Sequence, residues 1–244
     1  MENGMTIKWF DRLDSTNSEL LRHIDEYDNL SVVAAVEQFA GRGQRGNRWL
    51  SRPGDNLTFS LLLKPRDLPA AEFMSLTFMA TLAVRNWLED QGVSASIKWP
   101  NDIYVGKRKI CGMLIENGIS EGKITYSVIG IGLNLNQEAF PGELVNPISL
   151  KRLTGKETDP REALEDILSR FDTASLENGE HRKLLLTEYE ADLFQKGRLC
   201  LYRNILNDNE FYGTIEGVTL GGRLRVDVNG TSCSFAFKEI SYIL

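Results

Sequence analysis

The sequence has very little of two residue types that often carry metal or nucleophilic chemistry. Among its 244 residues only two are histidine, His23 and His181, and only three are cysteine. A histidine-based catalytic triad and a multi-histidine metal site are therefore nearly excluded. The cysteines are widely spaced and form no CxxC motif, which fits a reducing compartment and small packing side chains.

Long apolar runs and a signal peptide are also missing. No stretch approaches the length of a membrane span, and the first residues lack the basic and apolar regions of a secretory leader. The net charge is −6, whereas a general nucleic-acid binder is usually basic. These absences predict a cytoplasmic protein without a membrane or DNA partner. Its chemistry must depend on Lys, Arg, Asp, Glu or the backbone.

What the sequence does have is one stretch in which glycine alternates with arginine, from Gly41 to Trp49 (GRGQRGNRW). Glycine lets backbone N–H groups approach an anion closely, arginine adds forked donors, and tryptophan offers a flat face. We therefore expect a loop that closes over an anionic ligand carrying a ring. The spacing also matches G-x-G-x-x-G, but Pro53 and Gly54 follow instead of a helix, which argues against a dinucleotide fingerprint. A mobile surface loop is the simpler alternative.

A second stretch, from Lys98 to Asp102 (KWPND), interrupts a strand pattern over residues 96–105. Pro100 cannot donate to a strand ladder, and it holds the residue before it in extended backbone. Lys98 is therefore expected at a strand end beside irregular backbone, where functional side chains often lie; a hairpin turn with an exposed lysine is the alternative. Further on, Gly130 and Gly132 lie inside a predicted strand, which indicates a close approach by backbone or ligand, or a bulge.

Hydrophobic periodicity predicts two regions that differ in their secondary structure. Long helices and strands alternate up to about residue 195, whereas from Gly197 short strands alternate with Gly/Asn turns. Asn229-Gly230 is a strong type I′ hairpin signal. We therefore expect a large domain over residues 1–195 and a small five-stranded barrel over 196–244. Expected helices are one that starts with a Thr16/Glu19 capping box, then 69–91, 149–154, 160–177 and 181–193; expected strands are 7–10, 32–37, 57–63, 110–116, 123–133, 198–204, 210–218, 221–228, 231–237 and 240–244.

Taken together, these motifs resemble those of the biotin–protein ligases. The resemblance spans nearly the whole chain, and its specificity comes from the pairing of the glycine-rich stretch with the KWPND stretch. It implies an α+β fold, with a mixed β-sheet flanked by helices in a biotin/lipoate ligase-like catalytic domain and an SH3-like C-terminal barrel. The matching segments, in order, are Ser15-Thr16-Asn17, Gln38, Gly41–Gly46, Trp49, Lys98–Asp102 and Gly130–Asn134.

The resemblance also implies a reaction in two steps. Biotin and ATP, with Mg²⁺, give biotinyl-5′-AMP and pyrophosphate, and the biotinyl group then passes to one lysine of a biotin carboxyl carrier protein of a biotin-dependent carboxylase. Fixed cations and backbone N–H groups suit the first step, because two anions must meet in it. Some members also carry an N-terminal DNA-binding domain, and we expect a short form that lacks it. A homodimer is a possible assembly.

The site residues that the resemblance implies are carried over position by position. Gln44 stands where many members have arginine, which puts its role in holding the intermediate in doubt. Asn101 and Asp102 are plausible additions, and no metal ligand is identified. The implied catalytic residues are Lys98 and Arg42; the implied biotin-binding residues are Ser15, Thr16, Asn17, Gln38, Gly41, Arg42, Gly43, Gln44 and Lys98; the implied ATP- or adenylate-binding residues are Arg45, Trp49, Lys98, Lys109 and Asn134.

Two other functions compete with this hypothesis. A lipoate or octanoate ligase or transferase resembles the same catalytic architecture, but uses a different glycine/arginine pattern. A non-enzymatic adaptor that binds RNA or protein would use the glycine-rich stretch as its contact surface. The negative net charge argues against RNA, and the adaptor hypothesis leaves Lys98 beside its irregular strand end unexplained.

Overall fold

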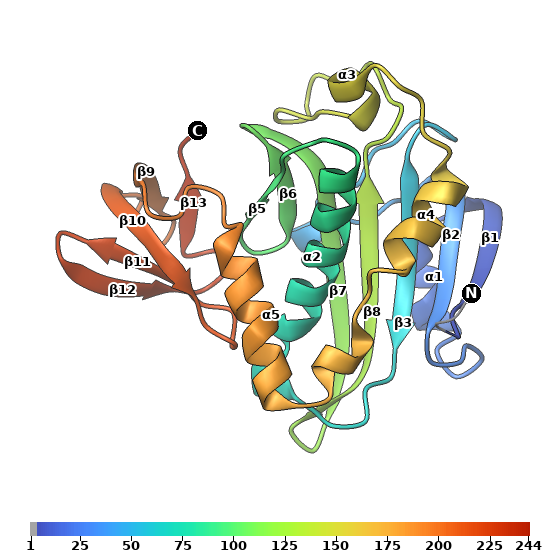
Figure 1. The fold of residues 1–244 in the computed structure, drawn as a ribbon, viewed down its shortest axis with the longest axis horizontal. Helices are drawn as coiled ribbons and strands as arrows, with labels where there is room; N and C mark the ends of the chain where they lie inside the picture. The colour runs from blue at the N-terminus through green and yellow to red at the C-terminus, as the bar shows by residue number, and fades with distance from the viewer. Residues whose placement is uncertain (1–3) are drawn as a thin grey trace.

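The structure, a computed structural model, describes residues 4–244 apart from the side chain of Arg45. Its larger part is an eight-stranded mixed sheet, in which β1 and β2 are parallel and the other neighbours are antiparallel (Figure 1). The strands lie in the order β1-β2-β3-β8-β7-β6-β5, and β4 pairs with β8. Their bounds are β1 Thr6–Leu13, β2 Ser31–Gln38, β3 Leu57–Leu63, β4 Leu68–Pro69, β5 Ser96–Lys98, β6 Asp102–Val105, β7 Arg108–Ser120 and β8 Lys123–Leu133.

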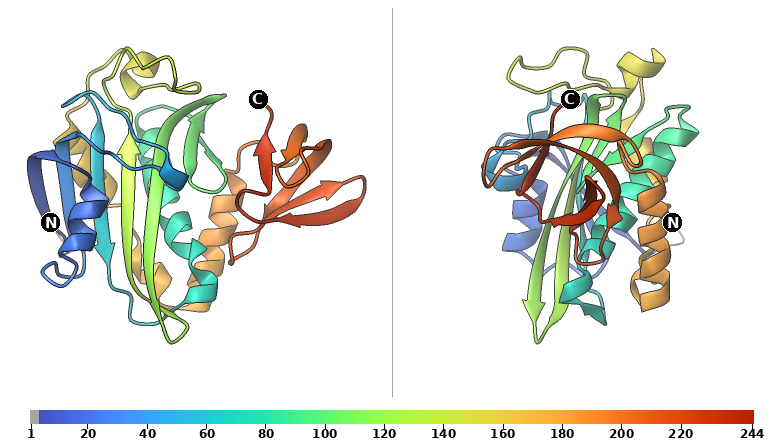
Figure 2. Two further views of the ribbon diagram at one scale, coloured as in Figure 1. Left: turned by 180° about the vertical axis from the view of Figure 1, so that it is seen from behind. Right: turned by 90° about the vertical axis from the view of Figure 1, so that its left-hand side faces the viewer.

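Helices cover both faces of this sheet. The helices α2 (Met74–Asp90), α4 (Pro160–Leu168) and α5 (Gly179–Ala191) lie on one face, and α1 (Thr16–Arg22) lies on the other (Figures 1 and 2). Strand β3 is buried along its whole length: Leu57, Phe59, Leu61 and Leu63 enter the main hydrophobic cluster, and Leu62 enters a second one on the other face. Thr58 and Ser60, also on that second face, are buried through hydrogen bonds instead. The mixed sheet flanked by helices is confirmed.

The C-terminal part forms a second, antiparallel sheet that projects from the side of the first (Figures 1 and 2). Its strand order is β12-β11-β10-β9-β13, which is consistent with a small SH3-like domain; no pairing of β12 with β13 closes a barrel in the described residues. Asn229 and Gly230 have φ values of 55° and 82°, as the expected type I′ turn requires. The domain boundary at residue 195 stays a prediction. The strand bounds are β9 Leu199–Asn204, β10 Glu210–Val218, β11 Leu224–Val228, β12 Thr231–Phe235 and β13 Ile240–Tyr242.

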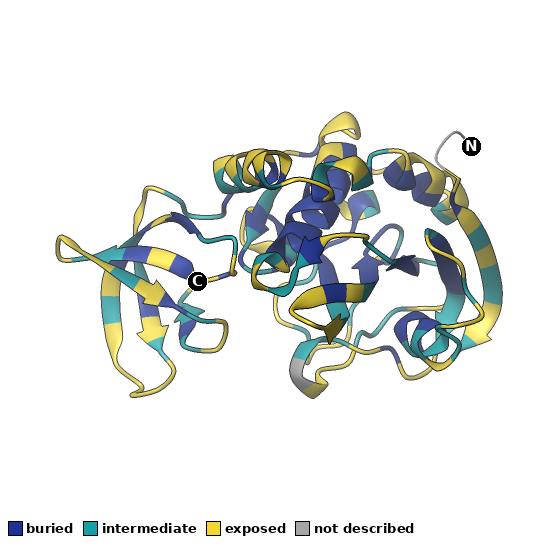
Figure 3. Cartoon of the chain, turned by 90° about the horizontal axis from the view of Figure 1, so that it is seen from below, coloured by how far each residue is buried: buried dark blue, intermediate teal, exposed yellow. Residues whose placement is uncertain are grey.

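Burial differs between the two sheets. Figure 3 shows that buried residues concentrate between the large sheet and its helices, whereas the small sheet is mainly half-buried or exposed. The thiols follow this division: Cys111 in β7 is fully buried, while Cys200 and Cys233 in the small sheet are half-buried. Among the described residues, no helix is long and apolar enough to cross a bilayer.

Three expected helix ends are wrong. The helix expected from residue 69 begins only at Met74, because Leu68–Pro69 pairs with β8 and a 3₁₀ turn, Ala70–Glu72, follows. The N-cap of α1 is Ser15, and the Thr16 hydroxyl contacts Gln38 instead of capping the helix, so the expected Thr16/Glu19 capping box does not form. The helix expected over 160–177 starts as predicted, with the Asp159 side chain accepting from a backbone N–H, but α4 ends at Leu168. Asp172 then caps a separate 3₁₀ turn over Thr173–Leu176, which breaks the helical run. Helix α3 covers Leu150–Thr154.

Candidate active site

A cavity of about 360 Å³ lies where the large sheet, the glycine-rich loop and the small sheet meet. It collects most of the residues that the sequence indicated. Gly41 and Asn134 are not among its lining residues: Gly41 lines a second hollow on the other side of the loop, and the Asn134 amide donates to the carbonyl of Ile148. The Arg45 side chain lies outside the described part of the chain. The expected residues that line the cavity are Ser15, Thr16, Asn17, Gln38, Arg42, Gly43, Gln44, Trp49, Lys98 and Lys109.

One end of the cavity is formed by neutral polar side chains at the start of α1. The Thr16 backbone N–H donates to Gln38 Oε1 at 2.8 Å, and Ser60 Oγ lies 2.7 Å from Thr16 Oγ1 and 2.6 Å from Asn17 Oδ1. The Asn17 amide nitrogen donates to Glu116 Oε2 at 2.9 Å. We call Thr16, Asn17, Gln38 and Ser60 the polar end; the first three line the cavity, and Ser60 contacts two of them without lining it. Because its hydrogen bonds are already made, their geometry is fixed before any ligand arrives.

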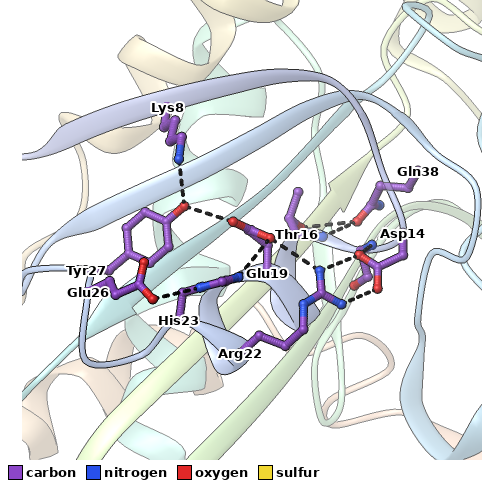
Figure 4. A network of polar contacts seen from close by, with 10 residues as sticks. Lys8, Asp14, Thr16, Glu19, Arg22, His23, Glu26, Tyr27 and Gln38 are labelled. Carbon is purple, nitrogen blue, oxygen red and sulfur yellow. Dashed lines mark hydrogen bonds and ion pairs between the residues drawn. The ribbon is translucent and has the colours of Figure 1, made fainter.

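Behind the polar end, a set of ion pairs holds the start of α1 (Figure 4). Asp14 Oδ1 accepts from the Ser15 backbone N–H at 2.8 Å, and both Asp14 oxygens accept from Arg22, at 2.5 and 3.0 Å. Hydrogen bonding from Arg22 lowers the pKa of Asp14. Arg22 also lies 3.3 Å from Glu19 in the first turn of the helix. These contacts tie the loop before α1 to the last turn of the helix.

The glycine-rich loop is a small hairpin of its own. The Trp49 N–H donates to the Gly41 carbonyl at 2.9 Å, and the Gly43 N–H donates to the Asn47 carbonyl at 2.7 Å. Only a 3₁₀ turn, Gln44–Gly46, lies at its tip, so the sequence argument against a dinucleotide fingerprint is confirmed. Arg42 forms two hydrogen bonds with the Glu116 carboxylate, at 2.7 and 3.1 Å, which tie the loop to β7.

Glycines on β7 and β8 form the floor beneath this loop. Gly112 and Gly132 pair across the two strands, and a Cβ atom on Gly132 would overlap the indole of Trp49. A Cβ atom on Gly130 would overlap the amide of Asn17 in the same way. The predicted close approach is therefore confirmed, and the groups that approach are side chains of this chain. Trp49 Nε1 is buried without a hydrogen-bond partner in the described structure.

The other end of the cavity is cationic and lies on strands β5, β6 and β7, toward the edge of the sheet that is far from α1. Lys109 Nζ lies 2.7 Å from Asp102 Oδ1. Lys98 Nζ donates to the Tyr104 hydroxyl at 3.2 Å and forms no ion pair with any described residue. Burial lowers the pKa of Lys98, while Asp102 acts in the opposite direction. We call Lys98, Asp102 and Lys109 the cationic end.

The small sheet also contributes to the cavity, which the sequence did not indicate. Phe237, Lys238 and Tyr242 line it, together with Ile240 and Ser241. The sheet packs on the KWPND segment, because Trp99 Nε1 donates to the Gly222 carbonyl at 3.2 Å and its ring meets Phe237 edge-on at 5.9 Å. Strand periodicity carries no information about this packing, so sequence reasoning could not find these residues.

Ser60 was missed for a different reason. It stands in β3, where Thr58 and Ser60 alternate with apolar residues, and its side chain is fully buried. A hydroxyl on a buried strand must find a buried partner. That rule would have indicated a buried polar network at this position before the structure was known.

Electrostatically, the cavity suits an anion. Among the side chains that the structure describes, five cations line it against one carboxylate, Asp102, in a chain whose net charge is −6. The described residues contain no group of three His, Cys, Asp or Glu side chains that could hold a metal ion. The donor set therefore does not fit a metal bound by protein ligands alone. The cations are Arg42, Arg48, Lys98, Lys109 and Lys238.

Comparison with known proteins agrees with this geometry. The biotin/lipoate A/B protein ligase family model matches residues 9–134, just over half of the chain. The chain therefore belongs to the biotin/lipoate A/B protein ligase family.

Its relatives are biotin ligases. A biotin--[acetyl-CoA-carboxylase] ligase of Paracoccus denitrificans is 35% identical over 66% of this chain and 69% of its own length. The bifunctional ligase/repressor BirA of Escherichia coli is 32% identical over 94% of this chain and 71% of its own length. The chain matches 62% of the length of BirA from Bacillus subtilis, to which it is 33% identical over 82% of its own residues. A second Bacillus BirA, 36% identical, is matched over 45% of its length.

A solved structure matches nearly the whole fold. Biotin protein ligase from Aquifex aeolicus, in complex with biotin and ATP, superimposes with a TM-score of 0.74 at 27% identity. The match covers 97% of each chain, so it includes both sheets.

Proposed function

We propose that the protein is a biotin–protein ligase. It activates biotin with ATP to biotinyl-5′-AMP and then transfers the biotinyl group to a specific lysine of a biotin carboxyl carrier protein. This proposal rests on the two different ends of one cavity. At one end, neutral polar side chains are already hydrogen-bonded to one another; at the other end, Lys98 forms no ion pair with a described residue, so its charge can interact with a ligand. Biotin has a matching form, a neutral ureido ring at one end and a carboxylate at the other.

In the first step, a carboxylate oxygen of biotin attacks the α-phosphorus of ATP. A P–O bond forms, the bond to pyrophosphate breaks, and negative charge grows on the phosphate oxygens. Lys98, which lines the cavity, would stabilise that charge, and Arg42, Gly43 and Gln44 are the predicted contacts from the loop. Thr16, Asn17 and Gln38 would hold the ureido ring, as part of the predicted biotin set.

In the second step, the ε-amine of the carrier lysine attacks the activated carbonyl, and AMP leaves. The hairpin formed by the glycine-rich loop would exclude water from the mixed anhydride in the meantime. Trp49 and Lys109 are the predicted adenylate contacts that line the cavity, and Trp49 already lies against the glycine floor. Asn134, the third predicted contact, does not line it. Any Mg²⁺ would bind through the nucleotide phosphates, since the described residues contain no group of three His, Cys, Asp or Glu side chains that could hold it.

A lipoate or octanoate ligase or transferase is the main alternative, and the family includes such enzymes by name. The polar end favours biotin over these acids. Ser60, Thr16 and Asn17 are buried and hydrogen-bonded, whereas the far end of lipoate or octanoate is apolar. An apolar ligand end at this position would displace water from the polar groups that face the cavity and offer them no hydrogen bond in return.

The test is pyrophosphate release from Mg·ATP in the absence of carrier protein, with biotin, lipoate or octanoate. Biotin-dependent release supports the proposal. Release with lipoate or octanoate alone would keep the fold and replace the substrate, and no release with any acid would favour a non-enzymatic adaptor.

The cytoplasmic location, the absence of DNA binding and the homodimer stay predictions. Cell fractionation tests the location, a gel shift tests DNA binding, and light scattering tests the homodimer.

A further inference from the structure

Two aromatic rings, one from each sheet, enclose the ammonium group of Lys98. Lys98 Nζ lies 4.7 Å from the ring centre of Tyr104 in β6 and 5.0 Å from the ring centre of Tyr242 in β13. Both distances are within the range of a cation–π interaction. The lysine therefore depends on the small sheet for one of its two rings.

These rings hold Lys98 without neutralising it. A carboxylate partner would cancel much of the positive charge, and Asp102, the one carboxylate that lines the cavity, is 2.7 Å from Lys109 instead. An aromatic ring attracts an ammonium through its quadrupole and adds no negative charge. The arrangement fixes the direction of the lysine and leaves its charge available for an incoming anion.

The ring of Tyr242 is itself firmly placed. Its centre lies 5.4 Å from that of Tyr202 and 6.1 Å from that of Phe194, and Phe194 lies 5.7 Å from Tyr104. The same stack continues into the small sheet, where Tyr202 lies 5.9 Å from Phe211. Other rings therefore hold Tyr242 in place, and the Lys98 ammonium is the group that its ring can orient.

The ring, and not the hydroxyl, explains the position of Tyr242. Its hydroxyl oxygen is buried and has no hydrogen-bond partner in the described part of the chain. A buried hydroxyl without a partner costs free energy, so it is not what selects this orientation. The contacts that remain are made by the ring, which meets Lys98 as well as Tyr202 and Phe194.

We propose that Tyr242 is a positioning residue for the adenylation step: its ring, supplied by the small sheet, holds the Lys98 ammonium in the direction of the reacting carboxylate and phosphate oxygens. The inference rests on the proposed function, and it gives the small sheet a defined task in catalysis.

The test separates the ring from the hydroxyl. In Tyr242→Leu, we expect kcat for biotin-dependent pyrophosphate release to fall about tenfold, because one cation–π contact is lost from a desolvated lysine. KM for biotin and ATP should change less than about twofold, because the ring acts through Lys98 and not on the ligands. Tyr242→Phe keeps the ring and should recover most of the rate. In a Lys98→Ala background, Tyr242→Leu should cause no further loss.

A matched control removes a ring from the same stack further from the site. Phe211→Leu loses packing in the small sheet without touching Lys98, so its kcat should stay near that of the wild type at a temperature where all variants are folded. An equal loss of kcat in Phe211→Leu would show a general structural effect and overturn the proposal. Unchanged kcat in Tyr242→Leu would overturn it directly.

A second readout does not depend on activity. Urea unfolding of Lys98→Met, Tyr242→Leu and the double variant should show coupling, so that the combined shift in midpoint is smaller than the sum of the single shifts. Additive shifts would contradict a direct contact. If coupling is found but the wild type releases no pyrophosphate with biotin, the proposed function fails while the contact stands.

Discussion

At the polar end of the cavity, Thr16, Asn17 and Ser60 are neutral and bonded to one another, whereas at the cationic end Lys98 is charged and held only by aromatic rings and one hydroxyl. The first end makes its hydrogen bonds within the protein, which fixes the direction of its donors and acceptors. The second end leaves a charge uncompensated. A single cavity can therefore offer a neutral ring fixed hydrogen-bonding groups at one end and attract an anion by positive charge at the other.

The largest expected effect comes from removing the uncompensated charge. Lys98→Ala should lower the rate of adenylation roughly 10²–10³-fold, because one preorganised group that stabilises transition-state charge is lost. Single-turnover pyrophosphate release measures it. Lys107→Ala is the control, since Lys107 is an exposed lysine of the nearby turn that does not line the cavity. Equal rates in the two variants would remove Lys98 from the catalytic assignment.

The glycine floor between the two ends gives the next effect. Gly132→Ala would place a Cβ atom on the indole of Trp49 and shift the loop, so KM for ATP should rise about 10–100-fold. Gly142→Ala is the matched control, because a Cβ atom there meets nothing within 4 Å. Steady-state kinetics with varied ATP distinguishes them. A normal KM in Gly132→Ala would mean that the position of Trp49 does not matter to the nucleotide.

The polar end is tested by removing its central hydroxyl. Ser60→Ala should lower the free energy of unfolding by about 1–3 kcal/mol, because Asn17 Oδ1 loses a buried donor, and should weaken biotin binding. Ser127→Ala offers a close comparison, since the Ser127 hydroxyl is equally buried but has no partner in the described structure. Urea titration and calorimetry with biotin measure both quantities. If Ser127→Ala lowers the free energy of unfolding as much as Ser60→Ala does, the hydrogen bonds of Ser60 do not account for its effect on stability.

The smallest effect is the pH dependence behind the polar end. Arg22 lowers the folded-state pKa of Asp14 below its ordinary value, so this pair stabilises the fold above that value, and its contribution disappears as the pH falls through the folded-state pKa. Both side chains are partly exposed, so the contribution is about 0–1 kcal/mol. Asp14→Asn should therefore be less stable than the wild type at pH 7 and equal to it near pH 2. A constant difference at both pH values would mean that packing, and not charge, is responsible.

The sequence predicted the strands that carry the site residues better than the contacts between those residues. Strand β3 was expected at its observed bounds, and the strand ends that carry Gln38 and Lys98 were expected within one residue. These features follow from local apolar patterns and turn residues. The expectation that Gly130 and Gly132 allow a close approach is also confirmed, because a glycine inside a buried strand leaves a gap that a neighbouring group fills.

What could not be predicted depends on contacts between distant segments. Tyr242 reaches Lys98 only because the small sheet packs on Trp99, and no periodicity in β13 indicates that packing. The capping box failed for the same reason: the Thr16 hydroxyl has a partner 22 residues away, in Gln38, that competes with the local cap. Predictions from local sequence patterns therefore fail where a side chain finds a partner from a distant segment of the chain.

The placement of the three cysteines has a practical consequence for spectroscopy. Cys111 lies on β7 next to the glycine floor, and complete burial raises its pKa far above the usual range, so a maleimide dye will not attach there under native conditions. Cys200 and Cys233 are half-buried in the small sheet. A thiol-directed fluorophore on the unaltered chain therefore reports on the sheet that carries Tyr242 and leaves the floor of the site chemically untouched.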